Sequence, residues 1–427
     1  MVGLALTLAQ KILLAHAEEG SVTTGEIVMV RCDVVMTNDI SGPVAFKAME
    51  RMGAKRVFDP AKVVVVPDHF IPAKDERSAS LQKLLKEWAD AQGVTYYGQG
   101  RGGIEHTVLV EEGWVVPGSV IAGGDSHTCT YGALGAIGTG LGSTDIAACL
   151  ATGMFWQAVP GTIRVEFTGD RQPFVTGKDL ILAVIAEIGV GGGMNSVLEF
   201  VGDGAASLTV DERLAVANMA VEAGAETGLF PADDTIAEYL DGRTERPWKA
   251  EHSDPDAELV RSVHIDLTTL PPLVALPNSP GNVVPLDEAV GLRIDQVYIG
   301  NCSNGTITDL RQAAELLRGR SVHASTRAIV VPASRKVYRQ ALAEGLIDVF
   351  VDAGAMVSTP TCGACFGGGM GILAPGERAL ATINRNFRGR MGSGESEVCL
   401  ANAWIAAAAA VTGEIVHPAD VLEGVPA

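Results

Sequence analysis

Two short apolar runs, each followed by an acidic residue and a histidine, set the strongest constraint on the fold. The pairs are Asp68 with His69 and Asp125 with His127. Apolar runs of this length without alternation are typical of strands buried on both faces of a parallel sheet. Ligands bind at the carboxyl ends of such strands in open α/β sheets, so the pattern predicts an α/β fold with a site at these ends.

The same pairs have the chemistry of an acid–base site. Histidine exchanges protons near neutral pH, and an adjacent carboxylate orients the ring and raises its pKa. A single pair is more often structural, whereas two pairs at two predicted strand ends favour catalysis. On the helix predicted over residues 209–224, Asn218 and Glu222 are four positions apart and have apolar neighbours, which predicts a buried functional pair on one face.

A glycine-rich stretch, residues 132–142, follows the second pair. It lacks the βαβ context of a dinucleotide-binding loop. We therefore expect its glycines to allow close packing of the backbone around the site.

Three cysteines form a second pattern. Cys302 follows a predicted strand that ends at Ile299, and Cys362 and Cys365 form a Cys-x-x-Cys loop before a run of glycines. A closed structural zinc site and a fully ligated iron–sulfur cluster each take four protein ligands. Three thiolates on a four-iron cluster leave one iron open to act as a Lewis acid. The spacing alone leaves a zinc site completed by a histidine, a thiol–disulfide redox pair and a structural role open.

Three arginines lie together after the strand predicted over residues 379–383. They are Arg385, Arg388 and Arg390, in a chain that is acidic overall. Arginine binds carboxylates through two parallel hydrogen bonds, so this segment predicts a site for an anionic substrate.

The charge and the cysteine content argue against several classes of protein. The chain has 32 basic and 51 acidic residues and a net charge of −19, which disfavours a nucleic-acid-binding surface. Its seven cysteines are an odd number and do not suggest a disulfide framework, so we expect a reducing, cytoplasmic location. The first residues lack the basic segment of a targeting sequence and an apolar run long enough for a bilayer, so we expect no membrane partner.

The length of 427 residues predicts two or three domains. Strands are expected at residues 27–35 and 349–351. Residues 231–285 are polar, turn-rich and rich in proline, and are predicted to be the main linker.

Together, these motifs and their order resemble the aconitase superfamily, and within it the large subunits of the 3-isopropylmalate dehydratase and homoaconitase type. The resemblance runs over residues 7–413. It implies three α/β/α domains, at residues 1–160, 161–284 and 285–427, around one 4Fe-4S cluster per subunit. It also implies that the swivelling fourth domain is absent from this chain and is carried by a separate small subunit.

The resemblance implies roles for individual residues. The cluster ligands are Cys302, Cys362 and Cys365. Acid–base or hydroxyl-contacting roles fall on Asp68, His69, Asp125, His127 and Glu222. Positions in the substrate pocket or beside the cluster fall on Asn38, Ser126, Asn218, Asn384, Arg385 and Arg390, and Asn304 is also expected beside the cluster. The chain departs from the commoner family residues at Asn301, Ala364 and Gly369, none of which removes a cluster ligand.

The implied function is the isomerisation of a 2-substituted malate, a small di- or tricarboxylate, by dehydration and rehydration. The first choice of substrate is 3-isopropylmalate, as in leucine biosynthesis, and homoaconitate, 2,3-dimethylmalate and other alkylmalates are alternatives. An RNA-binding regulatory protein on the same fold and a zinc or thiol-redox protein are alternatives of other classes. The net charge of −19 argues against the RNA-binding alternative.

Overall fold

Four β-sheets organise the residues that the computed structural model describes, 5–18 and 21–424. The first sheet has five parallel strands in the order β4-β3-β2-β5-β6. The two apolar runs form β3 and β5, which are buried along their whole length, as predicted. The strands are β2 Val34–Thr37, β3 Val63–Val65, β4 Thr95–Tyr96, β5 Val120–Gly123 and β6 Ile137–Gly140. The helices are α2 Ser41–Arg51, α3 Glu76–Gln92, α4 Glu105–Glu111 and α5 Ser143–Thr152, with short 3-10 segments η1 Pro60–Lys62 and η2 Ser126–Leu134.

The second sheet has four parallel strands in the order β10-β9-β8-β11. Its strands are β8 Gly161–Thr168, β9 Ser196–Val201, β10 Thr227–Leu229 and β11 Arg261–Asp266. The helices are α6 Gly177–Ile188, α7 Asp203–Ala206, α8 Val210–Asn218 and α9 Asp234–Leu240, and the 3-10 segment η3 Met219–Ala223 directly extends α8.

The third sheet is mixed and has seven strands in the order β13-β12-β18-β17-β14-β15-β16. β12 pairs antiparallel with β13 and β18, and the other pairs are parallel. The strands are β12 Leu273–Ala275, β13 Val283–Pro285, β14 Gln296–Gly300, β15 Arg327–Val331, β16 Met356–Val357, β17 Arg378–Ala381 and β18 Glu397–Leu400. The helices are α10 Leu286–Ala289, α11 Ile307–Leu317, α12 Arg335–Ala343, α13 Leu346–Asp352, α14 Ala403–Thr412 and α15 Pro418–Leu422, with the 3-10 segment η4 Gly363–Phe366.

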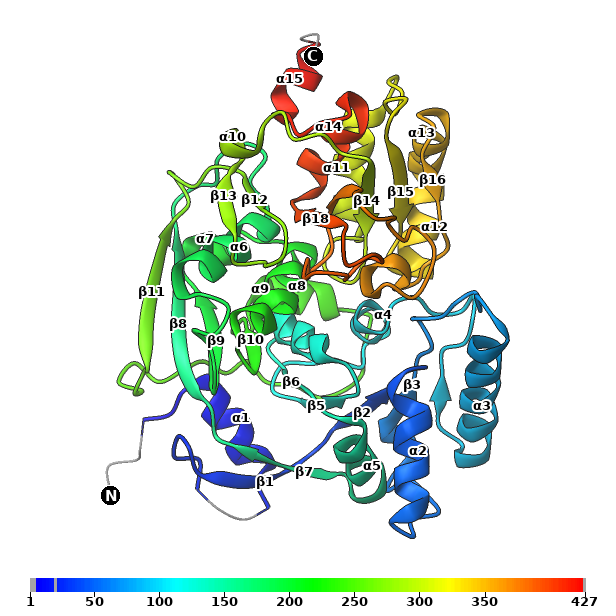
Figure 1. Cartoon of the computed structure of the whole chain (residues 1–427). Helices are drawn as coiled ribbons and strands as arrows, with labels where there is room; N and C mark the ends of the chain where they lie inside the picture. Colours follow the sequence, from blue (N-terminus) through cyan, green and yellow to red (C-terminus); the bar gives the residue numbers. More distant parts are fainter. Residues whose placement is uncertain (1–4, 19–20, 425–427) are drawn as a thin grey trace.

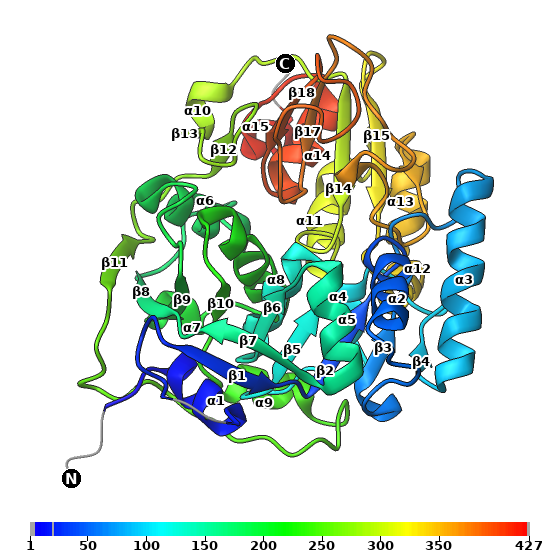
Figure 2. The same cartoon turned by 60° about the horizontal axis from the view of Figure 1, so that its bottom comes forward.

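A two-stranded antiparallel ribbon of β1 Ile27–Arg31 and β7 Met154–Ala158 forms the fourth sheet, beside the N-terminal helix α1 Leu8–His16. In Figure 1 the three larger sheets form three lobes, coloured blue to cyan, green, and yellow to red. The ribbon lies at the lower edge of the molecule in Figure 1, and Figure 2 shows it in front, running between the second and the first lobe. One hydrophobic core cluster contains residues of all three lobes, among them Val34, Val165 and Tyr298, so the lobes are packed directly on one another.

The α/β fold class is confirmed, and the three large sheets follow the three predicted domain ranges closely. The exceptions are β12 and β13, which lie before residue 285 but join the third sheet. The exact domain boundaries stay a prediction.

The predicted linker at residues 231–285 is wrong for much of its length. It contains α9, and β11 pairs with β8 in the second sheet. The longest irregular part is residues 241–260, and four of the prolines lie outside it, on either side of β12. Edge strands such as β11 tolerate a polar composition because only one of their edges pairs.

Two predicted strands also differ from the structure. The strand expected at residues 27–35 is two strands, because Cys32 bonds to the β7 side of the ribbon and Asp33 already bonds to β5. The strand expected at residues 349–351 lies within helix α13, where Val349 and Phe350 are buried and Val351 is exposed. A short apolar run does not distinguish a strand from a buried helix face.

Candidate active site

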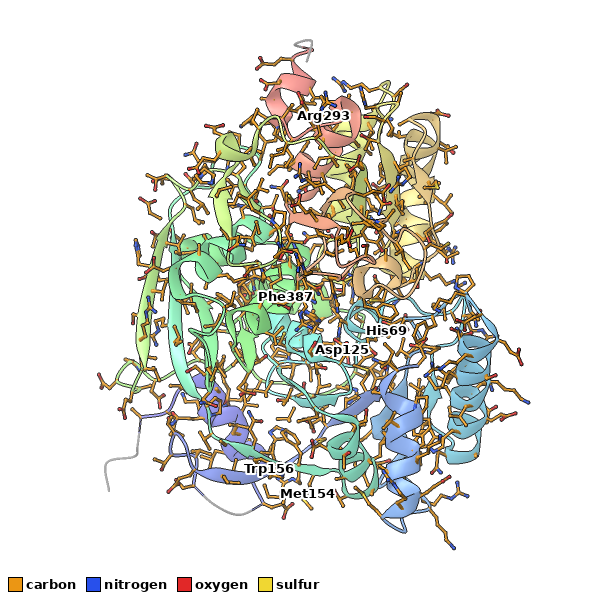
Figure 3. The ribbon with its side chains drawn as sticks, viewed as in Figure 1. His69, Asp125, Met154, Trp156, Arg293 and Phe387 are labelled. Atoms are coloured by element: carbon orange, nitrogen blue, oxygen red, sulfur yellow. The ribbon has the colours of Figure 1, made fainter. Side chains whose placement is uncertain are left out.

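Side chains from the three lobes meet near the centre of the molecule. His69 follows β3, Asp125 follows β5 and Phe387 lies beyond β17, and the three labels fall close together in Figure 3. The carboxyl ends of the first sheet therefore face the loops of the third sheet, as the strand-end pattern predicts.

His69 is held by two carboxylates. Its Nδ1 lies 2.6 Å from Asp68 Oδ1 and 3.5 Å from Asp39 Oδ1, and its Nε2 faces Asp125 Oδ2 at 3.8 Å. Asp39 also accepts hydrogen bonds from the backbone N–H groups of residues 68–70, which shapes the loop after β3. Although burial disfavours the imidazolium, Asp68 and Asp39 raise the pKa of His69 well above its ordinary value. The two carboxylates therefore favour the protonated ring, which presents Nε2 toward Asp125.

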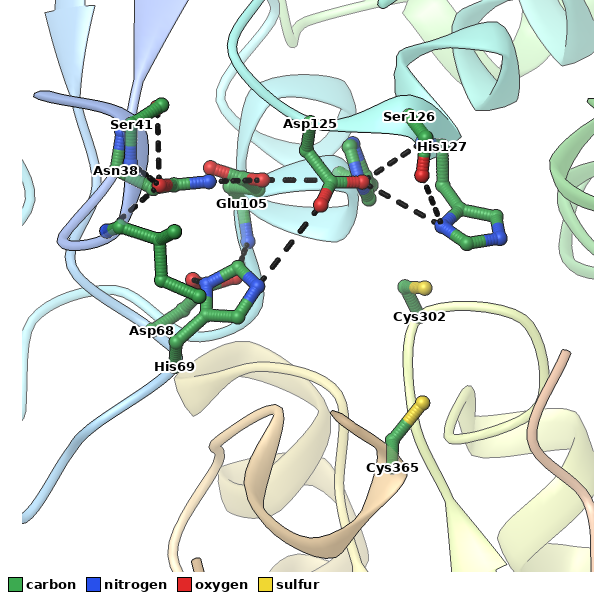
Figure 4. A network of polar contacts seen from close by, with 12 residues as sticks. Asn38, Ser41, Asp68, His69, Glu105, Asp125, Ser126, His127, Cys302 and Cys365 are labelled. Atoms are coloured by element: carbon green, nitrogen blue, oxygen red, sulfur yellow. Dashed lines mark hydrogen bonds and ion pairs between the residues drawn. The ribbon is translucent and has the colours of Figure 1, made fainter. Parts of the chain in front are cut away.

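Asp125 is the centre of a second network (Figure 4). Its Oδ1 lies 3.0 Å from His106 Nε2, accepts a 2.7 Å bond from the backbone N–H of His127, and lies 3.4 Å from His127 Nδ1. Burial opposes the charge of Asp125, but the hydrogen bonds with both histidines hold its pKa well below the ordinary range. The group is an anion placed between His69 and His127.

Glu222 connects this network to the arginine segment. Its Oε1 lies 2.8 Å from His127 Nε2 and accepts a 2.5 Å hydrogen bond from Arg385 Nε. Arg385 Nη1 donates to Ser126 Oγ at 3.0 Å. Burial opposes ionisation of Glu222, yet His127 and Arg385 lower its pKa. Asn218 and Glu222 are both buried, as predicted, at the end of α8 and in η3.

The three predicted ligand cysteines lie on the opposite side of the same space. Figure 4 shows the Cys302 and Cys365 side chains pointing toward the region below Asp125 and His127. All three are buried. The hydrogen bond from Cys362 and the positive charge of Arg390 lower the pKa of Cys365 to about 6, against the effect of burial.

Two asparagines surround the sulfur atoms. Asn218 Nδ2 lies 3.2 Å from Cys302 Sγ and 2.7 Å from Thr130 Oγ1. Asn384 Nδ2 lies 3.6 Å from Cys302 Sγ and donates to Asn218 Oδ1 at 2.9 Å, while its Oδ1 lies 3.6 Å from Cys365 Sγ. The Asn218 amide lowers the pKa of the Cys302 thiol, but burial outweighs it and raises that pKa well above its ordinary value.

The cysteine loop is tied directly to the first acid–histidine pair. The backbone N–H of Cys362 donates to the carbonyl oxygen of Asp68 at 2.8 Å, and Thr361 Oγ1 donates to the same oxygen at 2.9 Å. The ring of Phe366 packs edge-on against His69, with 4.9 Å between the ring centroids. These contacts cross from the third lobe to the first.

A cavity of about 540 Å³ opens beside these groups and suits a small acid. It is lined by Glu222, Phe366, Phe387 and three arginines, Arg385, Arg388 and Arg390. A second cavity, of about 660 Å³, lies beside β7 next to Trp156 and contains none of the predicted site residues (Figure 3).

Two of the expected asparagines are engaged elsewhere. The Asn38 oxygen accepts from Ser41 and from the backbone at the start of α2, and its Nδ2 donates to Glu105 Oε1 at 3.0 Å. Asn304 Nδ2 donates to Asp309 Oδ1 at 3.0 Å. Both are buried, and the polar contacts of both side chains are made with groups other than the cysteines.

The sequence analysis missed a third acid–histidine pair, Glu105 and His106. Both side chains are buried, His106 contacts Asp125, and the backbone N–H of Glu105 donates to Asp68 Oδ2 at 2.9 Å. The only sign of this pair in the sequence is that a glutamate and a histidine are adjacent. The two residues begin helix α4 and do not follow a strand, so the search for acid–histidine pairs at strand ends did not find them.

Comparison with known families places the chain. A family model described as the aconitase family (aconitate hydratase) matches residues 10–413. The chain belongs to the aconitase family. Members of this family generally bind an iron–sulfur cluster.

Curated relatives match over their full length. The protein named 3-isopropylmalate dehydratase large subunit 2 of Rubrobacter xylanophilus is 74% identical over 415 residues, which covers 97% of this chain and 98% of that protein. The 3-isopropylmalate dehydratase large subunit of Desulfitobacterium hafniense is 52% identical over 421 residues, covering 98% of this chain and 100% of that protein. A solved structure, the holo-form of Thermococcus kodakaraensis aconitase X, has a TM-score of 0.52 and 15% identity, covers 97% of this chain and 94% of its own, and supports the fold alone.

The cysteine site fits the family's cofactor. Three thiols from two loops of the third lobe converge, two of them contact Asn384, and Cys365 favours the thiolate. The other cysteines lie apart: Cys32 and Cys149 belong to the first lobe's core, Cys399 to the third lobe's, and Cys129 donates to the Asn218 carbonyl. Among the described helices, none is long and apolar enough to cross a bilayer.

Proposed function

We propose that this chain is the large, catalytic subunit of a hydro-lyase that interconverts 3-isopropylmalate and 2-isopropylmalate by dehydration and rehydration. The observation that carries the proposal is the meeting of three cysteine thiols, two acid–histidine pairs and an arginine-lined cavity in a chain 74% identical to a protein of that name.

The cofactor that we propose is one 4Fe-4S cluster, held by Cys302, Cys362 and Cys365. Three ligands leave one iron open, and when bound, that iron supplies a Lewis acid for the substrate hydroxyl and carboxylate. Asn218 and Asn384 would stabilise the ligand sulfur atoms through their N–H groups. A closed zinc site would need a fourth protein ligand in this position.

His69 is the proposed proton donor to the departing hydroxyl. Its protonated ring is fixed by Asp68 and Asp39 through Nδ1, which leaves the Nε2–H directed into the site. Asp125 and His127 would orient the hydroxyl from the other side. Glu222 holds His127 in place while it also positions Arg385.

The arginines are proposed to hold the substrate carboxylates while the intermediate is rehydrated. Arg390 lines the cavity, and its Nη2 lies 4.0 Å from Cys365 Sγ, which places its guanidinium beside both the cavity and the cysteine loop. Arg385 is already fixed by Glu222 and Ser126. Val190, Val221 and the two phenylalanines on the cavity wall suit an alkyl substituent better than the additional carboxylate of homoaconitate.

A separate small subunit is the proposed partner and would close over the cavity. Large apolar side chains are exposed near the mouth, among them Val190 and Phe387, and Met370 beside the cysteine loop. Clusters of exposed apolar residues mark protein–protein contacts. The curated relatives are themselves named as large subunits.

The test is an anaerobic purification, reconstitution with iron and sulfide, and measurement of iron, sulfide and zinc with the electron paramagnetic resonance spectrum after mild oxidation. A three-iron signal that disappears when ferrous iron is restored is the expected result. Cys365→Ser should lose the cluster and, with the small subunit added, lose dehydration. Zinc in stoichiometric amount without sulfide would overturn the proposal.

The substrate is tested with the reconstituted pair of subunits. Isopropylmalate, dimethylmalate and homoaconitate are compared by kcat/KM. Isopropylmalate is expected to be the preferred substrate, and a preference for homoaconitate would contradict the alkyl assignment of the cavity wall.

A further inference from the structure

Lys178, in the first turn of α6, is a buried cation without a carboxylate partner. Its exposed fraction is 0%, and none of the ion pairs among the described residues includes it. The ammonium donates to the carbonyl oxygen of Ile383 at 2.8 Å and contacts Met219 Sδ at 3.1 Å. A buried, unpaired ammonium costs several kcal/mol unless another negative charge compensates for it.

Both contacts lead to the cysteine site. Met219 directly follows Asn218 and Ile383 directly precedes Asn384. These two asparagines are the ones whose amide groups lie against Cys302 Sγ. The ammonium therefore contacts both of the chain segments whose asparagines face the sulfur atoms.

The carboxylates near Lys178 are already engaged. Asp309 accepts hydrogen bonds from Asn304 and Thr306, and burial raises its pKa to about 6. Asp179 accepts from Asn402 and from the backbone N–H of Leu273, and burial raises its pKa as well.

Burial lowers the pKa of Lys178 to about 8, while Asp309, the thiols of Cys302 and Cys365, and Asp179 support its charged form. Ligated thiolates at Cys302 and Cys365 would therefore add negative charge to that of the carboxylates around the ammonium.

We propose that Lys178 is a positioning residue of the cluster site, which supplies the buried positive charge that balances the ligated thiolates and holds the segments of Asn218 and Asn384 in place. The inference rests on the proposed function, because the cluster would fix all three ligand thiols as anions. Three thiolates on a core of two positive charges leave one negative charge, which one ammonium neutralises. The charges in the site would then balance when the cluster is bound, and the unpaired ammonium would destabilise the cluster-free protein.

The test compares the wild type with Lys178→Met, which keeps the length and removes the charge, and Lys178→Arg, which keeps the charge. Three quantities are measured: the rate of iron loss to a chelator, the reduction potential of the cluster, and the urea midpoint of the cluster-free chain. Arg213→Met is the matched control. Arg213 is also fully buried, but it forms an ion pair with Asp233 at 2.6 Å and does not contact the cysteines.

We expect opposite effects on the two forms of the protein. Lys178→Met should lose iron at least about tenfold faster and have a lower reduction potential, since a nearby positive charge favours the reduced cluster. Its cluster-free form should be as stable as the wild type or more stable. Lys178→Arg should keep the wild-type potential, and Arg213→Met should reduce stability without changing the potential.

Each other outcome overturns the inference. Equal loss of stability in both forms of Lys178→Met, with unchanged iron loss and potential, would show that Lys178 only fills space in the core. If the methionine variant does not fold, Lys178→Gln gives the same readouts, because it also removes the charge while keeping a polar N–H group. A wild-type chain that takes up no iron or sulfide would instead refute the proposed function, and the inference with it.

Discussion

Replacing the Asn218 amide by a carboxylate would test how the site supports its thiolates. Asn218→Asp preserves the shape of the side chain but removes the N–H group that lies 3.2 Å from Cys302 Sγ. It also removes the donor to Thr130. Both changes occur at a fully buried position, where neither water nor salt screens the new charge.

The size of the effect follows from the distance. A carboxylate oxygen 3.2 Å from a thiolate is repelled by about 5 kcal/mol at an effective dielectric constant near 20. A lost N–H donor in a buried site costs about 1–3 kcal/mol more. The repulsion and the lost hydrogen bond together exceed what one neighbouring side chain can offset. The cluster should therefore be lost, or the introduced carboxyl should take up a proton.

The assay is the rate of iron release from the reconstituted protein between pH 6 and pH 9. At low pH the introduced carboxyl is protonated and iron release should approach the wild-type rate. As the pH rises the carboxyl ionises, so its repulsion of the thiolate appears and release should become much faster. Asn386→Asp is the control, because Asn386 is equally buried but donates to the carbonyls of Leu276 and Val398 rather than to sulfur.

Wild-type iron release by Asn218→Asp across this pH range would refute the reasoning. So would an equal acceleration in Asn386→Asp, because the effect would then come from a general loss of stability. Urea unfolding of both cluster-free variants separates the two explanations.

Three further predictions concern other parts of the molecule. Arg385→Lys keeps a charge but loses the planar fork, and should raise KM for the substrate about tenfold or more in steady-state assays with the small subunit, with unchanged urea stability. Burial opposes the charge of His16, but its hydrogen bonds with Asp33 and a backbone carbonyl raise its pKa above the ordinary value of 6.5. The resulting stabilisation is present below pH 6.5 and is lost as the pH rises through the raised value. His16→Gln should therefore lower the urea midpoint more at pH 6 than at pH 9, and an equal loss at both pH values would contradict the assignment. Gly132→Ala would place a methyl carbon 1.7 Å from a backbone carbonyl oxygen at β10 and should destabilise the chain by about 3 kcal/mol or more, whereas Gly191→Ala meets no atom within 4 Å and should change stability by less than about 0.5 kcal/mol in the same unfolding assay.

The parts of the site that follow strands could be predicted from sequence. Asp68, His69, Asp125 and His127 come directly after apolar runs, and the parallel pairing of the first sheet brings these ends to one edge. The glycine stretch at residues 132–142 packs closely, as expected, because its backbone touches β10 and η2. Hydrophobic periodicity and the residues that follow a strand are local features of the chain, so a single sequence is enough to recognise them.

Lys178 and His106 could not be predicted in this way. Lys178 lies in the first turn of an apolar helix, where a lysine is usually solvated, but here its ammonium is buried against Met219 and the Ile383 carbonyl. His106 reaches Asp125 across the first sheet from the start of α4. Both depend on how lobes and loops pack, which no short stretch of sequence records.

The hydrogen bonds to the Asp68 carbonyl oxygen connect the proposed metal site to the proposed proton donor. Cys362 and Thr361 hold that carbonyl, and Asp68 holds His69. If the cysteine loop carries metal as proposed, loss of that metal should also loosen the hydrogen bonds of the loop to the Asp68 backbone. It should then disable the proposed proton donor together with the proposed Lewis acid, and restoring the metal should restore both.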